Sequence, residues 1–137
     1  MGVPMTRVKD IVQDRPLFSV ESGQSVAEVA GRMAELRVGA ILVVENGALR
    51  GLFSERDLMT RVVVERCDPQ TTPVDAVMTS NLATIEETAT LEDALEQMHT
   101  HNCRHLPVMR CGQVAGFLSM RDLMNYELDR KIGRAHV

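Results

Sequence analysis

The hydrophobic pattern of the first half of the chain predicts a strand, a helix, a two-stranded hairpin and a second helix. After Ser25, apolar residues recur every three or four positions, which is the spacing of one buried helix face: Val26, Val29, Ala30, Met33 and Leu36. A continuous apolar run at 40–44 and a returning strand at 49–53 flank Asn46-Gly47, a dipeptide that favours a tight hairpin turn. The other expected elements are a helical turn at 6–13, a strand at 17–20 and a helix at 54–66.

The second half of the chain repeats the first. Gly-Leu-Phe-Ser-Glu-Arg-Asp-Leu-Met at 51–59 returns as Gly-Phe-Leu-Ser-Met-Arg-Asp-Leu-Met at 116–124, an offset of 65 residues. Such a repeat indicates one structural unit written twice, and a copy of about 60 residues buries too little surface to be comfortable alone. The expected elements of the second copy are a turn at 74–78, strands at 82–85, 106–109 and 114–118, and helices at 91–99 and 121–130.

The repeated segments place Ser-x-Arg-Asp directly after a predicted strand, beginning at Ser54 and at Ser119. One interpretation is a capping box, in which the serine and the acid satisfy free amides at the start of a helix. Ser25 and Thr90 begin ordinary motifs of that kind elsewhere in the same copies. The added arginine and the preceding glycine favour a second interpretation, a ligand site, and the sequence alone leaves both open.

Composition narrows the class of protein. The chain has 137 residues, a net charge of −4, 3% aromatic residues and no Trp, so it lacks the basic surface and stacking rings of a nucleic-acid-binding protein. No apolar run reaches the roughly 18 residues that span a membrane, and no secretory signal is recognisable, so we expect a cytoplasmic protein without membrane contact. Three cysteines without a CxxC pair also suit a reducing compartment.

The duplicated element order, the Ser-x-Arg-Asp-Leu segments and Arg-His-Leu-Pro-Val at 104–108 together resemble a tandem pair of CBS domains, a Bateman module. The resemblance covers residues 8–131. It implies an α+β fold with two β-α-β-β-α repeats packed sheet to sheet about a pseudo-twofold axis, and a homodimer. The implied domain bounds are an N-terminal arm at 1–7, CBS domain 1 at 8–66, a linker at 67–73 and CBS domain 2 at 74–131.

The last six residues, at 132–137, match what one reading frame of a common sequencing adapter encodes. We therefore expect a non-native tail here. This interpretation leaves open whether the native chain continues past Lys131 into another domain.

The resemblance further implies that two clefts between the repeats take an adenosine nucleotide. In the family, the aspartate at the helix start holds the ribose hydroxyls, the serine lies near phosphate, and the other repeat lines the adenine. A carboxylate that accepts from two vicinal hydroxyls is chemically suited to that role. The first cleft would use Ser54, Arg56, Asp57, Met78, Ala83, Cys103, Arg104 and His105. The second would use Ser119, Arg121, Asp122, Gln13, Phe18, Val38, Gly39 and Ala40.

The two implied clefts differ in charge. Where the second copy offers Arg104 and His105, the first copy has Gly39 and Ala40. We therefore expect the Asp57 cleft to take the more highly phosphorylated ligand, with His105 contributing a charge as the pH falls from about 8 toward 6. The alternative for Arg104 is a solvated strand end.

A lower-ranked hypothesis is a metal site. His99, His101, Cys103 and His105 alternate by two, and such side chains would share one face if the segment were a strand. The spacing matches no zinc signature that we recognise. We expect no required cofactor, with the adenosine nucleotide as a regulatory ligand.

No motif for catalysis stands out, because the chain has neither a Gly-x-Ser-x-Gly elbow nor a phosphate-binding Walker loop. We expect a regulatory sensor for AMP, ADP, ATP or a related adenosyl ligand, and not an enzyme. One alternative is a dimerising structural or metal-binding module with empty clefts. Another is the detached regulatory part of a larger enzyme or transporter, acting on an unidentified partner protein.

Overall fold

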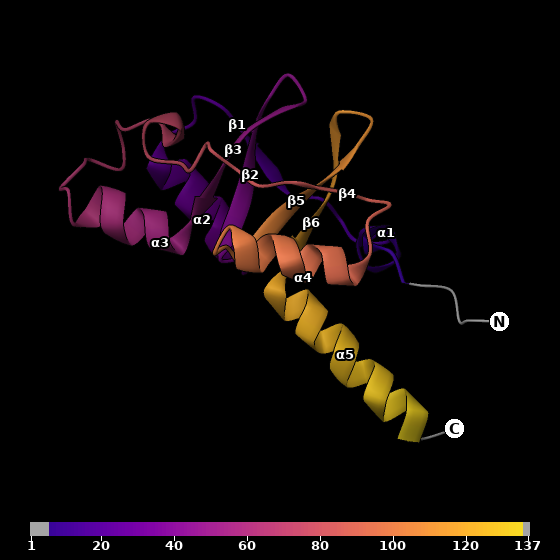
Figure 1. Cartoon of the computed structure of the whole chain (residues 1–137). Coiled ribbons are helices and arrows are strands. Elements are labelled where there is room, and N and C mark those ends of the chain that lie inside the picture. Colours follow the sequence, from indigo (N-terminus) through magenta and orange to yellow (C-terminus); the bar gives the residue numbers. More distant parts are fainter. Residues whose placement is uncertain (1–5, 136–137) are drawn as a thin grey trace. The chain divides into compact units, whose positions relative to one another are not determined.

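The computed structural model describes the backbone of residues 6–135 and the side chains of residues 6–127. The chain forms two compact units. We call Phe18–Leu82 the continuous unit, and Met1–Leu17 together with Ala83–Val137 the split unit. Each unit is α+β and holds one three-stranded sheet, which confirms the predicted fold class (Figure 1).

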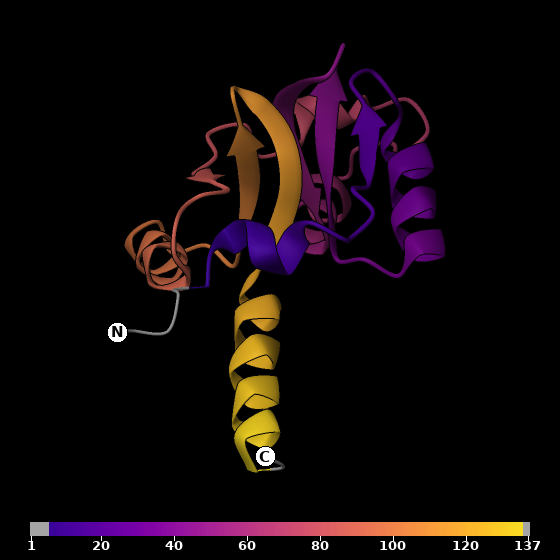
Figure 2. The ribbon, with the colours of Figure 1, turned by 90° about the vertical axis from the view of Figure 1, so that its right-hand side faces the viewer.

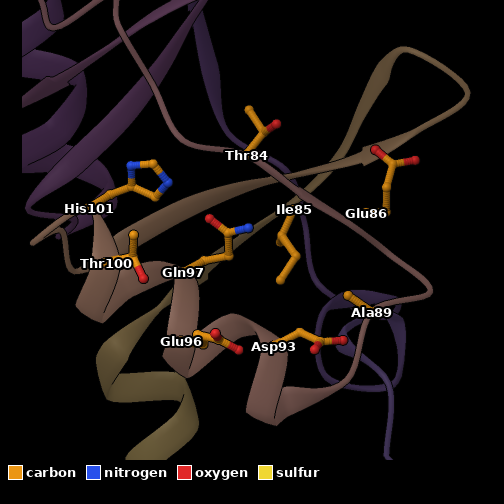
Figure 3. Close-up of a pocket in the computed structure, with 9 residues that line it drawn as sticks. All are labelled: Thr84, Ile85, Glu86, Ala89, Asp93, Glu96, Gln97, Thr100 and His101. Atoms are coloured by element: carbon orange, nitrogen blue, oxygen red, sulfur yellow. The ribbon is translucent and has the colours of Figure 1, made fainter.

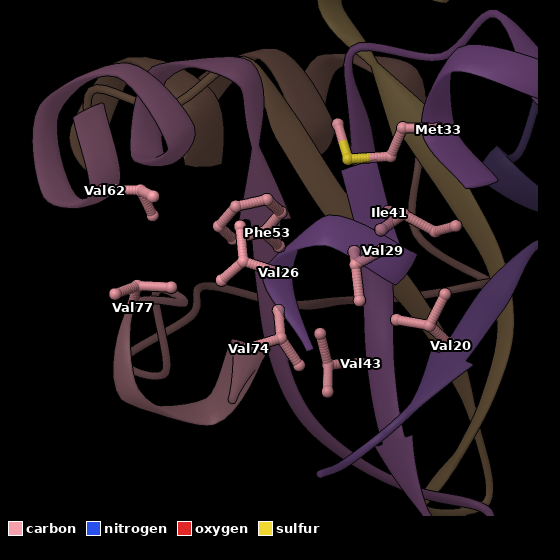
Figure 4. Close-up of a cluster of buried hydrophobic side chains, with 10 residues drawn as sticks. All are labelled: Val20, Val26, Val29, Met33, Ile41, Val43, Phe53, Val62, Val74 and Val77. Atoms are coloured by element: carbon pink, nitrogen blue, oxygen red, sulfur yellow. The ribbon is translucent and has the colours of Figure 1, made fainter. Parts of the chain in front are cut away.

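The continuous unit contains the strands β1 (Ser19–Glu21), β2 (Ala40–Glu45) and β3 (Ala48–Ser54), in that order across the sheet. β1 runs parallel to β2 and β2 antiparallel to β3, with the helix α2 (Val26–Leu36) as the connection between β1 and β2. One face of α2 and the strands surround an apolar core (Figure 4). This core consists of Val20, Val26, Val29, Met33, Ile41, Val43, Phe53, Val62, Val74 and Val77.

After β3, the continuous unit ends in short helical segments. α3 (Glu55–Asp57) leads directly into η1 (Leu58–Val63), which is a π-helix, and η2 (Val74–Ala76) is a 3-10 turn. In η1 the Thr60 hydroxyl donates to the carbonyl of Arg56 at 2.8 Å, so this acceptor of the regular α-helical ladder is engaged by a side chain. The main-chain amides of Val64 and Cys67 then donate hydrogen bonds to carbonyls five residues earlier, those of Met59 and Val62.

The split unit repeats the sheet order with β4 (Ile85–Glu86), β5 (His105–Arg110) and β6 (Gln113–Ser119). Its helices are α1 (Val8–Val12), α4 (Leu91–Thr100) and α5 (Met120–Ala135). α1 lies beside the sheet of this unit (Figure 2), where it completes a core with β5, β6 and α4. The buried members of this core are Val8, Val12, Ile85, Ala94, Met98, Leu106, Val108, Leu118 and Leu123.

In each unit, one strand glycine allows close packing of the segment that leads into the other sequence copy. A methyl group at Gly51 would lie 2.6 Å from Met78 Sδ and 2.8 Å from the carbonyl oxygen of Thr79. A methyl group at Gly116 would lie 2.7 Å from Val12 Cγ2. The first residues of copy two therefore pack on the sheet of copy one, and the first residues of copy one pack on the sheet of copy two.

The structure corrects several predicted boundaries. The first strand of each sheet begins later and ends later than expected, because Leu17 and Leu82 precede the strands β1 and β4. The predicted continuous helix at 54–66 is a short α-helix followed by π-helix, whereas its counterpart α5 is an uninterrupted α-helix. The hairpin prediction at Asn46-Gly47 is confirmed by positive φ values of 52° and 83°, as a tight primed turn requires.

Candidate functional site

The first repeated acid, Asp57, is fixed by the end of β3. Ser54 caps α3, since its hydroxyl accepts from the Asp57 amide at 3.2 Å. In return, Asp57 Oδ2 accepts from the Ser54 amide and from the Ser54 hydroxyl, both at 3.1 Å. The capping interpretation of this motif is therefore confirmed, and the Ser54 hydroxyl already donates within its own unit.

Two further side chains surround the Asp57 carboxylate. The Thr79 hydroxyl donates to Oδ1 at 3.2 Å, and Arg61 Nε lies 3.6 Å from the same oxygen. Arg61 is held over the acid because its Nη1 also donates to the carbonyl of Met78 at 2.9 Å. As a result the Asp57 side chain is 9% exposed, and both of its oxygens have partners inside the continuous unit.

The second repeated acid, Asp122, lies in a more open position at the start of α5. Its Oδ2 accepts from the Ser119 amide at 2.7 Å, and the Ser119 hydroxyl accepts from the Asp122 amide at 3.1 Å. Its Oδ1 lies 2.8 Å from Arg15 Nη1, and the side chain is 18% exposed. Within the described part of the chain, no contact has the Ser119 hydroxyl as donor, so its proton remains available to a ligand.

Each helix start is joined to the beginning of the middle strand of its own sheet. Ala40 pairs with Ser54, and the Glu55 amide donates to the carbonyl of Gly39 at 2.9 Å. In the split unit, His105 pairs with Ser119, and the Met120 amide donates to the carbonyl of Arg104 at 2.8 Å. Two of the first three amides of each helix therefore already have acceptors, which leaves phosphate recognition mainly to side chains.

The His105 ring stacks on Phe117 with centroids 5.3 Å apart and planes 14° apart. Burial lowers the pKa of His105, while the nearby Asp122 carboxylate acts to raise it and Arg104 to lower it. The lowered pKa does not support the expectation that His105 becomes charged between pH 8 and 6, because the neutral form is favoured down to lower pH. His105 instead supplies an uncharged ring beside the Asp122 site.

The predicted nucleotide-binding residues are divided between the two units. The continuous unit contains Ser54, Arg56, Asp57, Met78, Phe18, Val38, Gly39 and Ala40. The split unit contains Ser119, Arg121, Asp122, Gln13, Ala83, Cys103, Arg104 and His105. Each implied cleft draws on both sets, so its full composition stays a prediction.

The metal hypothesis is not supported by the geometry. Of its four candidates only His105 lies in a strand, since His99 is in α4, His101 follows that helix and Cys103 lies in the loop before β5. The expected alternation on one strand face is therefore absent. Among the side chains at 6–127, no group of three or more His, Cys, Asp or Glu residues is arranged to hold a metal ion.

A separate pocket of about 630 Å³ lies in the split unit between α4 and the segment at 84–89 (Figure 3). None of the predicted nucleotide-binding residues lines it, and of the four metal candidates His101 does. Its wall includes three acids, Glu86, Asp93 and Glu96, so its charge opposes an anionic ligand. The charge of this pocket therefore does not favour a phosphorylated ligand.

Comparison with known proteins identifies the family. The family model of the CBS domain matches this sequence twice, at residues 8–64 and 74–129. The chain belongs to the CBS domain family. The CBS domain-containing protein YhcV of Bacillus subtilis is 35% identical over 119 residues, which cover 87% of this chain and 84% of YhcV.

Solved CBS structures have the same fold. A putative signal-transduction protein with CBS domains from Burkholderia ambifaria superposes with a TM-score of 0.84 at 29% identity, covering 90% of this chain and 95% of that one. The CBS domain protein PAE2072 from Pyrobaculum aerophilum, solved in complex with AMP, gives a TM-score of 0.77 at 30% identity, covering 85% and 89%. These likenesses confirm the resemblance to a CBS pair inferred from the repeat.

Other relatives are much longer. Several CBS domain-containing proteins of Arabidopsis thaliana match at 33–34% identity, and the chain spans about a fifth of their length. In the portion of the chain that the structure describes, no helix has both the length and the apolar character required to cross a bilayer.

Three side chains at the two acids were absent from the predicted set: Arg61, Thr79 and Arg15. Arg61 follows Asp57 by four residues, so helical spacing could have identified it. Thr79 and Arg15 reach the acids from segments that lead into the other copy, and no local sequence pattern reports that contact.

Proposed function

We propose that this chain is a regulatory module, not an enzyme, that binds an adenosine ligand such as AMP with Asp122 and Asp57 as the ribose acceptors. The observation that carries the proposal is the Asp122 site. Its carboxylate is partly exposed at the start of α5, beside a serine hydroxyl whose proton is available. A vicinal diol and a phosphate or hydroxyl of one ligand would complement these two groups. The AMP complex of PAE2072 supports this ligand class.

The first test is calorimetric titration of AMP into the parent protein and into Asp122→Ala. We expect the substitution to weaken AMP binding at its site by about tenfold to a hundredfold, because charge-assisted hydrogen bonds to the ribose are lost. Asp93→Ala is the matched control, since Asp93 occupies the same third position of a capping box on α4. The control should bind AMP as the parent does.

Unchanged AMP affinity in Asp122→Ala would show that the acid caps a helix and nothing more. The alternative function, a structural module without nucleotide, predicts that AMP leaves the melting temperature of the parent protein unchanged. A ligand that binds the folded state must raise that temperature. We propose that the module requires no cofactor and that the adenosine nucleotide is its regulatory ligand.

We also infer that the chain forms a homodimer through apolar side chains that its own units leave exposed. Met59, Val63 and Val64 are exposed on and beside η1, and Met124, the repeat counterpart of Met59, is exposed on α5. The sequence favours apolar helix stripes for this interface that include Met59, Val62, Val63, Met124 and Leu128. Of these, Val62 is buried in the core, and Leu128 lies outside the described side chains. Light scattering at micromolar concentration should give twice the chain mass, and Met59→Asp should lower it.

A further inference from the structure

Arg15, which pairs with Asp122, has a backbone fixed by hydrogen bonds and a side chain that is partly exposed. α1 is fixed to the split unit by two main-chain bonds, from the Val8 amide to the carbonyl of Ala89 at 2.8 Å and from the Lys9 amide to that of Glu87 at 2.9 Å. The Arg15 amide then bonds to the carbonyl of Val12 at 3.2 Å. Its side chain is nevertheless 43% exposed, so the guanidinium can leave the acid without disturbing the core.

The guanidinium competes with a ribose for the same oxygen. Asp122 Oδ2 is engaged by the Ser119 amide at 2.7 Å, which leaves Oδ1 as the more accessible acceptor. Arg15 Nη1 lies 2.8 Å from Oδ1. Two vicinal hydroxyls that bind this carboxylate must therefore displace or crowd the arginine. His105, which also lies near Asp122, has a lowered pKa and does not replace the lost positive charge.

We propose that Arg15 is a specificity-determining residue that makes the Asp122 site select phosphorylated adenosine ligands over unphosphorylated ones; this inference rests on the proposed function. When AMP binds, the displaced guanidinium pairs with the ligand phosphate, which its planar fork of donors suits. When adenosine binds, the ligand offers no anion. Adenosine must therefore break the ion pair without compensation, and AMP exchanges one charged partner for another.

The continuous unit has no arginine at the position equivalent to Arg15. The repeat counterpart of Arg15 is Ser80, which carries no charge. The cation beside Asp57 is Arg61, which lies farther from the acid, at 3.6 Å, and is also bound to main-chain carbonyls. Selection by Arg15 is therefore a property of the Asp122 site, which departs from the sequence-based expectation that the Asp57 cleft takes the more highly phosphorylated ligand.

The test measures the affinities of AMP and adenosine for the parent protein, Arg15→Ala and Lys9→Ala by titration calorimetry. Lys9→Ala is the control, because it removes one positive charge from the same N-terminal segment at an exposed position. We expect Arg15→Ala to bind adenosine more tightly and AMP less tightly, so that the ratio of the two affinities falls about tenfold. Lys9→Ala should keep the parent ratio.

A double-mutant cycle assigns the effect to Asp122. In the Asp122→Ala background, Arg15→Ala should no longer tighten adenosine binding, because the ion pair is already absent. The single variant Arg15→Ala should remain folded, with a melting temperature within about 4 °C of the parent, since exposed ion pairs stabilise little.

The outcomes separate the two claims. A parent protein that binds neither ligand overturns the proposed function and this inference with it. A parent that binds both ligands, with Arg15→Ala weakening them equally, leaves the proposed function intact and shows that Arg15 stays on Asp122 as a positioning residue. An unchanged ratio in Arg15→Ala likewise overturns the selection role of Arg15 alone.

Discussion

Asp57 and Asp122 are the same residue in two copies of one motif, yet they have different surroundings. Asp57 has an additional hydroxyl from Thr79 and an additional bond from the Ser54 hydroxyl, and its side chain is half as exposed as that of Asp122. Among the described side chains, the partner that is added at Asp122 is Arg15, whose side chain is 43% exposed. The first acid is engaged mainly in the fold, and the second retains capacity for a ligand.

The difference arises from the segments that pack on each sheet and not from the motifs. The segment that covers Gly51 brings Thr79 to Asp57, and the segment that covers Gly116 brings Arg15 to Asp122. The repeated Ser-x-Arg-Asp motif therefore determines how the helix begins in each copy. The less similar connecting segments decide how much of each site remains open.

The largest effect we predict is on stability at the first acid. Asp57→Ala removes the reciprocal half of the capping box, the acceptor of the Thr79 hydroxyl and the acidic partner of Arg61, so it should lower the free energy of unfolding by about 3 kcal/mol. Asp122→Ala removes a cap and a surface ion pair, and should cost about 1 kcal/mol. Urea unfolding of both variants measures the difference.

Equal losses in the two variants would remove the distinction between a structural and an accessible acid. Thr79→Val sharpens the test, because it deletes one hydrogen-bond partner of the Asp57 carboxylate. Thr79 belongs to the continuous unit, whereas Asp122 belongs to the split unit. In the Thr79→Val background, Asp57→Ala should cost less than it does alone.

A smaller difference is expected at the two strand glycines. Gly51→Ala should destabilise by about 2 kcal/mol, because the added methyl group meets the main-chain carbonyl of Thr79, which cannot rotate away. Gly116→Ala should cost about 1 kcal/mol, because the methyl group meets the Val12 side chain, which can shift. Thermal unfolding monitored by circular dichroism measures both.

Val12→Ala should recover part of the loss in Gly116→Ala, since it removes the group that collides. Gly31→Ala is the control. It lies in α2 with no atom within 4 Å of the added carbon, so it should stabilise by roughly 0.5–1 kcal/mol. If Val12→Ala deepens the loss instead, the contact between α1 and the sheet is not the cause of the strain.

The sequence predicted the elements and the motifs well, because both depend on local patterns. Helical spacing found α2, and Asn46-Gly47 found its hairpin. The π-helix was missed, since a hydroxyl bond from Thr60 to a main-chain carbonyl changes no hydrophobic period.

The candidate site was predicted in part. Serine and aspartate at each helix start follow from the capping chemistry and the repeat. Their neighbours depend on which segment packs on which sheet, and a sequence repeat suggests that each copy folds on its own residues. The contact of Arg15 with Asp122 joins positions 15 and 122, and nothing in the local sequence reports a pairing over that distance.

The packing of α1 on the split unit has a consequence for protein synthesis. The chain emerges from the ribosome N-terminus first, so Val8–Val12 is exposed to the cell long before β5 and β6 have been made. The continuous unit is complete in one uninterrupted stretch before β5 and β6 are made. α1 is therefore synthesised well before the strands on which it packs, and until then Val8 and Val12 lack the core that buries them.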